Sequence, residues 1–388
     1  MHEATPAPIA SDEYRARVTA AQHALADRDI DGLLCLDYHD VVYLSGFHHS
    51  PNERPVGLYV APDGVPCLFV PRLEREHAEA VWDGPLEVYE EYPGDPHPVV
   101  WMAERIDARR FGVDALDLRV AQLLQARGRA PVACDAIERL RWIKSEAELD
   151  LTRVAARFAD RCLEHVLAGA GDIVRHGGTE LDILDAALSA TRSDMTRALG
   201  TRFEGTPTRV VGTVHTGPRA ALPHGRTSER RPERGDVLIA GIGVAVGGYH
   251  AESGATFTFG TPSAEQHRCL EAADACDRAA REACRPGQAG THVNAVAHGV
   301  LRDAGLGDTI RHRIGHGMGL QGHESPWLAP GGGEPIAVGM VFSNEPGIYR
   351  PGVDGYRTIN SMIVTATETE VPSRFQDEHP IEARVLEP

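Results

Sequence analysis

The sequence predicts a two-domain α+β protein, in which a smaller N-terminal α/β domain precedes a larger, strand-rich C-terminal domain. The chain has 388 residues, which is too long for a single compact core and fits domains of roughly 140 and 240 residues. Apolar residues make up 42% of the chain and charged residues 24%, an ordinary balance for packed globular proteins. The order of the helix-like and strand-like patterns along the chain decides the class of each domain.

The first part of the chain combines one helix with short apolar runs. Apolar residues at three- and four-residue spacing predict an amphipathic helix over residues 12–28, with Ser11 available to cap its first turn. Four apolar runs of the kind that form strands follow, and Asp63-Gly64 predicts a hairpin turn between the last two. These runs are 31–37, 41–47, 57–62 and 65–71.

The second domain is expected to begin at a strong helix-start signal, which divides the chain into domains 1–141 and 142–388. Ser145 followed by Glu148 resembles a capping box, and it predicts a helix that runs to about residue 169. Farther along, glycine and proline separate strand-like runs, and a long helix is expected over 263–285. The strand-like runs are 209–217, 236–249, 255–260, 340–349 and 361–366.

Charge and composition exclude several classes of partner. Acidic residues outnumber basic ones 56 to 39, for a formal charge of −17, and such a field repels nucleic acid and anionic membranes. No signal peptide and no membrane span of roughly 20 apolar residues is evident, so we expect a cytoplasmic protein. The seven cysteines are odd in number and include no CxxC pair, which predicts reduced thiols.

Four segments of the second domain together resemble the creatinase and Xaa-Pro peptidase family. The resemblance implies a C-terminal pita-bread domain and an N-terminal domain of the creatinase type, because the segments follow the family's order and spacing. The segments are HTGPRAALPHGR (215–226), RGDVLIAGIGVAVGGYHAESGATFTFG (234–260), HRIGHGMGLQGHESP (312–326) and FSNEPGIYRPGVDGYRTINSMIVT (342–365).

In the peptidases of this family, two Asp, one His and two Glu side chains hold two divalent metal ions that activate a water molecule. The resemblance places these positions at Gly241, Glu252, His316, Glu345 and Ile359 of this sequence. Glycine and isoleucine offer no ligand atom, and bridging carboxylates are needed to hold two cations close together. We therefore expect no dinuclear centre, and we favour a site without any metal or cofactor.

The metal-free branch of the family, typified by creatinase, matches more of the pocket. By this resemblance, His224 is the general acid/base, and Glu252 and Glu345 bind and polarise a cationic substrate. His316 and His323 would orient water or an oxyanion. The chemistry is coherent, because paired carboxylates attract a cation and a histidine can exchange protons near neutral pH.

Four further residues are candidates for substrate binding. Arg54 aligns with an N-domain arginine that reaches the partner subunit's site in creatinase, which implies a homodimer. Arg357 matches the family arginine beside the lost Glu, and Trp327 stands where creatinase has a second carboxylate-binding arginine. Tyr249 completes the set.

The favoured function is therefore a metal-independent hydrolase that cleaves a C–N bond of a small cationic or amino-acid-derived substrate. Three alternatives remain open. The first is an Xaa-Pro peptidase-like enzyme that uses one residual metal ion at Glu252, His316 and Glu345. The second is a lyase or dehydratase on the same scaffold, and the third is a pseudoenzyme that binds peptides.

Overall fold

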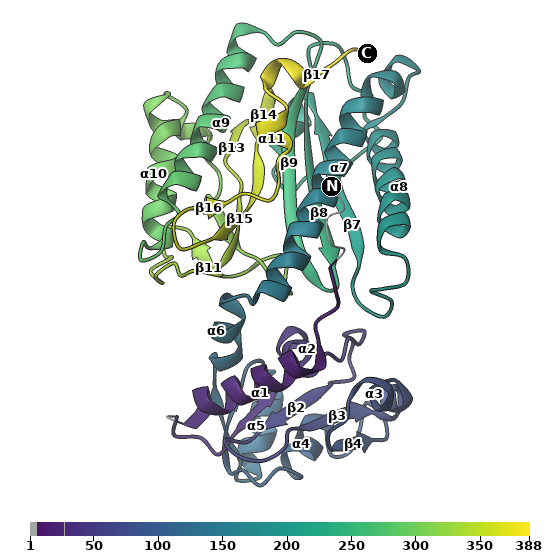
Figure 1. Ribbon diagram of the computed structural model, residues 1–388, viewed down its shortest axis with the longest axis vertical. Helices are drawn as coiled ribbons and strands as arrows, with labels where there is room; N and C mark the ends of the chain where they lie inside the picture. The colour runs from purple at the N-terminus through teal and green to yellow at the C-terminus, as the bar shows by residue number, and fades with distance from the viewer. Residues whose placement is uncertain (1–5, 27) are drawn as a thin grey trace. The chain divides into compact units, whose positions relative to one another are not determined.

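The computed structural model describes residues 6–26 and 28–388, and these form two compact units. One unit is built on Ile9–Arg141 and the other on Trp142–Pro388. Each has its own β-sheet flanked by helices, as Figure 1 shows.

The first unit contains a mixed six-stranded sheet in the order β4-β3-β2-β1-β5-β6. The predicted hairpin is confirmed, because β2 and β3 pair antiparallel on either side of Asp63-Gly64. The pairs β1–β5, β5–β6 and β3–β4 are parallel. The strands are β1 Leu33–Cys35, β2 Gly57–Val60, β3 Cys67–Pro71, β4 Leu86–Tyr89, β5 Arg110–Val113 and β6 Ala130–Ala133.

The prediction of a strand over residues 41–47 is wrong. Most of this apolar run lies in helix α2, where the Asp37 side chain accepts hydrogen bonds from the backbone N–H groups of His39 and Asp40. This N-cap satisfies the first turn, so the apolar residues that follow continue as a helix. The predicted first helix is confirmed over Ser11–Ala26, while residue 27 of its expected range lies outside the described residues.

The helices of the first unit are α1 Ser11–Ala26, α2 Tyr38–Ser45, α3 Arg75–Val81, α4 Pro98–Ala103, α5 Leu118–Ala126 and the start of α6 Ala136–Trp142, with a 3₁₀ turn η1 at Arg72–Glu74. Buried side chains of the strands pack against α4 and α5 in a single apolar cluster. This packing gives the unit a core of its own.

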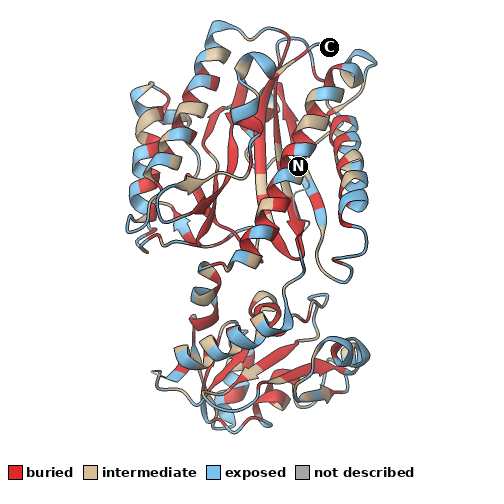
Figure 2. Ribbon diagram, in the orientation of Figure 1, coloured by how far each residue is buried: buried red, intermediate tan, exposed pale blue. Residues whose placement is uncertain are grey.

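The second unit is built on a nine-stranded sheet whose main path is β11-β10-β12-β15-β9-β8-β7. Neighbouring strands on this path pair antiparallel. Figure 2 shows its central strands buried along most of their length. The strands are β7 Arg209–Thr216, β8 Val237–Val246, β9 Tyr249–Phe259, β10 Gly315–Gly317, β11 Glu324–Leu328, β12 Val341–Asn344, β15 Ile359–Val364, β16 Thr369–Glu370 and β17 Val385–Leu386, with a separate pair β13 Gly347–Arg350 and β14 Asp354–Arg357.

Two helix pairs cover this sheet. Helices α7 and α8 pack against β7, β8 and β9, and α9 and α10 pack toward β11, β12 and β15 (Figure 1). The Ser145–Glu148 capping box is confirmed, although the helix that it opens continues six residues beyond the expected end. The helices are α7 Glu146–Arg175, α8 Glu180–Leu199, α9 Ala264–Ala283, α10 Gly290–Asp303 and α11 Phe375–Glu378, with 3₁₀ turns η2 Gly217–Ala221, η3 Gly307–Thr309 and η4 Ile381–Ala383.

All seven cysteines are free, and six of them are buried. Within the described ranges, no helix is both long and apolar enough to cross a bilayer.

Candidate active site

The candidate site lies in the second unit, where strands of the large sheet bring three polar side chains together. Glu252 lies on β9 and His316 on β10. Glu345 directly follows β12, and its backbone N–H donates to the carbonyl of Ile314 (2.8 Å). Because β10 pairs with β12 and β12 with β15, which pairs with β9, residues distant in sequence meet on one face.

The imidazole of His316 is the centre of this cluster. It is completely buried, and its Nδ1 lies 3.1 Å from the Gly317 carbonyl. Its Nε2 lies 3.0 Å from Glu345 Oε1 and 3.8 Å from Glu252 Oε2. Even so, Nε2 makes no hydrogen bond of acceptable geometry with any described residue. The buried nitrogen therefore lies between two carboxylates and is ion-paired with Glu345 when the imidazole is protonated.

The surroundings of the two carboxylates shift their pKa values in opposite directions. Burial and the nearby Glu345 raise the pKa of Glu252, whose Oε2 accepts a hydrogen bond from Ser343 Oγ (2.8 Å). Burial acts in the same direction on Glu345, but His316 and Arg357 outweigh it and hold the pKa of Glu345 below its usual range. The pKa of His316 is raised despite burial, because both carboxylates favour the imidazolium. A positive charge is thus strongly favoured between these groups.

Two of the other predicted histidines lie around this centre. The His323 ring stacks on His316 with ring centroids 3.7 Å apart, and its Nε2 lies 3.9 Å from Glu252 Oε1. Burial and the His316 charge lower the pKa of His323 to about 4. His224 is exposed in the turn after η2, and its charge acts on both His312 and His323.

A residue that the sequence reasoning missed also belongs to this site. His312 Nε2 lies 2.9 Å from the Tyr349 hydroxyl, and its Nδ1 lies 2.7 Å from the Arg313 carbonyl. Glu345, Arg357 and His224 all act electrostatically on its ring. The sequence did contain a signal for this residue, because His312 stands four residues before His316 in the same motif.

The remaining predicted substrate-binding residues occupy different environments. Tyr249 is buried, and its hydroxyl donates to Glu148 Oε1 (2.7 Å) at the start of α7. Trp327 is partly exposed, with the Arg313 guanidinium 4.5 Å from its ring centroid. Arg54 lies in the first unit, where it is ion-paired with Glu91 and Glu53. Arg357, in the second unit, acts electrostatically on both carboxylates.

The side chains of the site can be compared with those that hold two metal ions in the peptidases that the sequence resembles. A dinuclear centre does not fit, because Gly241 and Ile359 carry no donor atom. A single ion does fit. Donor atoms of Glu252, His316 and His323 lie within 4.8 Å of one another, and Glu345 faces the same buried nitrogen. Imidazole and carboxylate donors suit zinc and related divalent metals.

Comparison with known protein families agrees with this fold. Residues 150–366 match metallopeptidase family M24, and residues 17–143 match the creatinase/prolidase N-terminal domain. The chain belongs to family M24. The expected fold class, a creatinase-type domain followed by a pita-bread domain, is therefore confirmed, and so is the expected enzyme class, a hydrolase of C–N bonds.

Several similar proteins are named as dipeptidases. The M24 chain is 33% identical over 363 residues to a probable dipeptidase PepE of Mycobacterium tuberculosis, covering 92% of this chain and 93% of that protein. It is 29% identical over 338 residues to an Xaa-Pro dipeptidase of Lactobacillus delbrueckii subsp. lactis, covering 83% and 87%. The crystal structure of dipeptidase PepE from Mycobacterium ulcerans superposes with a TM-score of 0.84 at 28% identity, covering 98% and 100%.

The names of these relatives can be compared with the narrower prediction from the sequence, which placed the chain in a metal-free branch of the family. They are named as dipeptidases, including an Xaa-Pro dipeptidase, and so they do not support placing this M24 chain in the metal-free, creatinase-like branch. They favour the alternative of a peptidase-like enzyme with a reduced metal site.

Proposed function

We propose that this M24 chain is a dipeptidase-like hydrolase that uses one divalent metal ion held by His316, Glu252 and Glu345, with His323 as a fourth donor. The observation that carries the proposal is the buried Nε2 of His316, which faces two carboxylates and makes no hydrogen bond with any described residue. The substrate class is a small peptide, by analogy with the dipeptidases that share most of its length.

A divalent ion in such a site polarises the scissile carbonyl and lowers the pKa of water. The chain's own groups prepare the site for it. The Gly317 carbonyl accepts from Nδ1 of His316 when that nitrogen carries the proton, which leaves the Nε2 lone pair free to bind. Ser343 orients Glu252 through its hydrogen bond to Oε2. Two carboxylates and neutral imidazoles would offset the charge of one divalent cation.

Proton transfer to the leaving amine needs a separate group, and we assign it to His224. This histidine is exposed on the turn after η2 and close enough to act electrostatically on His312 and His323. Histidine is the side chain that most often acts as a general acid or base in enzymes. His312, buried against the Tyr349 hydroxyl, is suited to hold a substrate oxygen.

The first test compares activity and metal content. Protein stripped with a chelator should lose hydrolysis of dipeptides, including Xaa-Pro dipeptides, and regain it with Mn²⁺, Co²⁺ or Zn²⁺. Glu345→Gln should weaken metal affinity by more than about 100-fold, since the loss of an outer-shell partner alone costs about 10- to 100-fold. His224→Ala should retain the metal but lower kcat by about 10²- to 10⁴-fold.

His267→Ala is the matched control, because this partly exposed histidine on α9 lies outside the site. It should leave both readouts unchanged. Full activity in the stripped protein would instead support the metal-independent, creatinase-like hydrolase. Metal binding without turnover of peptides would support the lyase, and absence of both would support the peptide-binding pseudoenzyme.

We also propose that the chain acts as a homodimer in which Arg54 serves the partner's site. The support is the alignment of Arg54 with an arginine that has this role in creatinase. In this chain its guanidinium is ion-paired with Glu91 and Glu53.

A further inference from the structure

The position of His323 is not explained by hydrogen bonds of its own side chain. Its ring stacks on His316 with centroids 3.7 Å apart, and its side chain is 53% exposed. Among the described residues, none forms a hydrogen bond with this ring. The backbone that carries His323 therefore decides where the ring lies.

That backbone lies next to a break in the sheet. His316 on β10 pairs with Trp327 on β11. Its neighbour Gly317 pairs with Glu324, which leaves residues 325–326 outside the ladder. Extra residues of this kind disrupt the ladder locally and re-aim nearby side chains, often beside active sites. Contacts other than strand pairing have to hold this end of β11.

Two side chains from the start of the second unit hold the residues at this break. Lys144 Nζ lies 2.8 Å from Glu324 Oε1, and the two side chains are only 2% and 3% exposed. Trp142 Nε1 donates to Ser325 Oγ (2.8 Å). Charge-assisted contacts are stronger than neutral hydrogen bonds, so Lys144 ties down the residue that directly follows His323.

The segment that supplies these two side chains is itself firmly placed. The Lys144 backbone N–H donates to the Gly339 carbonyl (3.0 Å). The next residue, Ser145, caps the long helix α7. The Trp142 ring packs against a buried apolar cluster of the second unit. Lys144 and Trp142 therefore have fixed positions from which to hold β11.

The carboxylate of Glu324 also closes the turn before His323. Its Oε2 accepts a hydrogen bond from the backbone N–H of Gln321 (3.3 Å). The carbonyl of Gln321 in turn accepts from the backbone N–H of Gly319 (3.0 Å). One buried ion pair thus organises the backbone on both sides of His323.

We propose that Lys144 and Trp142 are positioning residues, which hold His323 over His316 through Glu324 and Ser325. The inference rests on the proposed single-metal hydrolase, in which His323 is the fourth donor, and it adds the groups that keep this donor in place. A donor that is already in position binds more tightly than one that must be ordered when the metal arrives.

The contact between the two rings tests this role without any metal. In metal-free protein with isotope-labelled histidine, the ring protons of His316 and His323 should show a nuclear Overhauser effect. Lys144→Met/Glu324→Gln removes both charges of the buried pair and keeps a side-chain oxygen for the Gln321 N–H. The effect should be lost in this double variant. Its absence from the wild type, or an equal effect in both proteins, would overturn the inference.

Co²⁺ affinity tests the same role in the loaded site. His323→Ala and Lys144→Met/Glu324→Gln should each weaken Co²⁺ binding by about 10- to 100-fold, the usual cost of losing an orienting partner at a metal site. The triple variant should bind Co²⁺ no more weakly than His323→Ala alone, because residues that act through one another are not additive. Additive losses would show that the ion pair does not act through His323.

Arg153→Met is the matched control, because it removes another ion pair of the same unit, with Glu370 (2.8 Å). It should change neither the ring contact nor the Co²⁺ affinity. Thermal melts identify any variant that does not fold. If the double variant does not fold, Ser325→Ala replaces it. This variant removes one hydrogen bond to Trp142 and should weaken Co²⁺ binding about 2- to 10-fold; an affinity equal to wild type would overturn the inference.

These outcomes separate the inference from the proposed function. If the wild type binds Co²⁺ but hydrolyses no dipeptide, the proposed function fails, and the comparison of affinities still tests the positioning. If the wild type binds no Co²⁺, the proposed function fails as well, and the ring contact decides. If the wild type is a metal-dependent dipeptidase but the double variant keeps both the ring contact and the affinity, only the inference fails.

Discussion

At the scale of single residues, buried histidines have opposite roles in this domain. His316 has its pKa raised, because Glu345 and Glu252 outweigh the effect of burial. His298, on α10, has no such carboxylates, and burial lowers its pKa from 6.5 to about 4, with a further contribution from Arg302 and His312. The charged form of the His316 imidazole is therefore favoured, whereas the His298 imidazole is held neutral.

The neutral state of His298 predicts a pH dependence of stability. The unfolded chain binds a proton at His298 near pH 6.5, but the folded chain does not until about pH 4. Between these values the unfolded state holds more protons, so stability is fully present above about pH 6.5 and falls as pH decreases toward 4. After a discount for solvent screening, the contribution is about 1 to 2 kcal/mol.

Replacing His298 by Leu should remove this part of the acid sensitivity. Urea denaturation between about pH 6.5 and pH 4 should show a smaller loss of stability in His298→Leu than in the wild type. His292→Ala, an exposed substitution on the same helix, should follow the wild type. Parallel curves for wild type and His298→Leu would show that another group is responsible.

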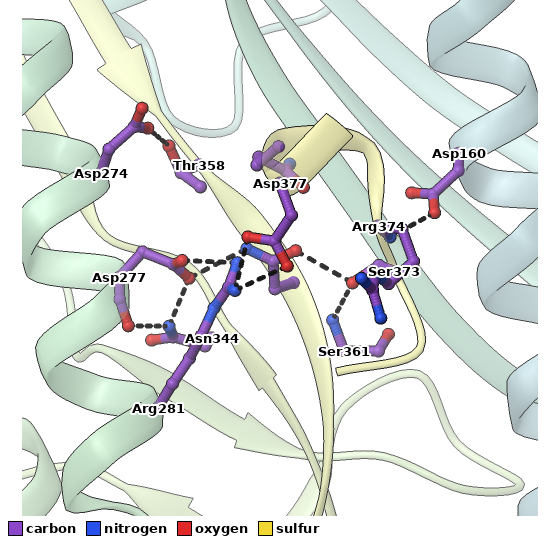
Figure 3. A network of polar contacts seen from close by, with 12 residues as sticks. Asp160, Asp274, Asp277, Arg281, Asn344, Thr358, Ser361, Ser373, Arg374 and Asp377 are labelled. Carbon is purple, nitrogen blue, oxygen red and sulfur yellow. Dashed lines mark hydrogen bonds and ion pairs between the residues drawn. The ribbon is translucent and has the colours of Figure 1, made fainter. Parts of the chain in front are cut away.

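At the scale of secondary structure, a buried polar network connects helix α9 to the strands that carry the site. Asp277 Oδ1 accepts from the side-chain amides of Asn344 (2.7 Å) and Asn360 (2.9 Å), and its Oδ2 pairs with Arg281 (2.7 Å). Figure 3 shows Asp277, Arg281 and Asn344 together, with Asp377 on the other side of the guanidinium. Asn344 precedes Glu345, so this network holds the end of β12 from which Glu345 follows.

Loss of Asp277 should therefore destabilise the domain strongly. Asp277→Ala removes the buried carboxylate that pairs with Arg281 and accepts from the amides of Asn344 and Asn360, and breaking a buried pair costs about 3 to 5 kcal/mol. Urea denaturation measures this loss directly. Glu282→Ala, on the exposed face of α9, should stay within about 0.5 kcal/mol of wild type, and a similar value for Asp277→Ala would refute the structural role of the network.

At the scale of the whole molecule, the proposed homodimer shares its active sites between two chains. If Arg54 serves the partner's site, Arg54→Ala and His224→Ala affect the same site from different chains. Coexpression of the two variants should then restore about a quarter of wild-type activity, because about half of the dimers are mixed and each mixed dimer has one complete site.

Light scattering during size exclusion measures the mass and should give twice that of the chain. Each variant expressed alone should show strongly reduced activity, which is the baseline for the coexpression. A monomeric mass, or no gain on coexpression, would show that Arg54 does not act across a dimer.

The sequence alone was enough for most of the fold. Helix starts such as Ser145–Glu148 and turns such as Asp63-Gly64 are local, since each depends on residues a few positions apart. The strand predicted over 41–47 is a helix, because a short apolar run suits a strand or a buried helix equally and the Asp37 cap decides for the helix. The division into domains 1–141 and 142–388 stays a prediction.

For the site, the sequence determined which donors exist, since Glu252, His316 and Glu345 remain and Gly241 and Ile359 offer none. Only the tertiary structure decided where their charges meet. The buried Nε2 of His316 lies between two carboxylates that come from different strands. Such contacts depend on strand pairing across more than a hundred residues, and no local pattern in the chain records that pairing.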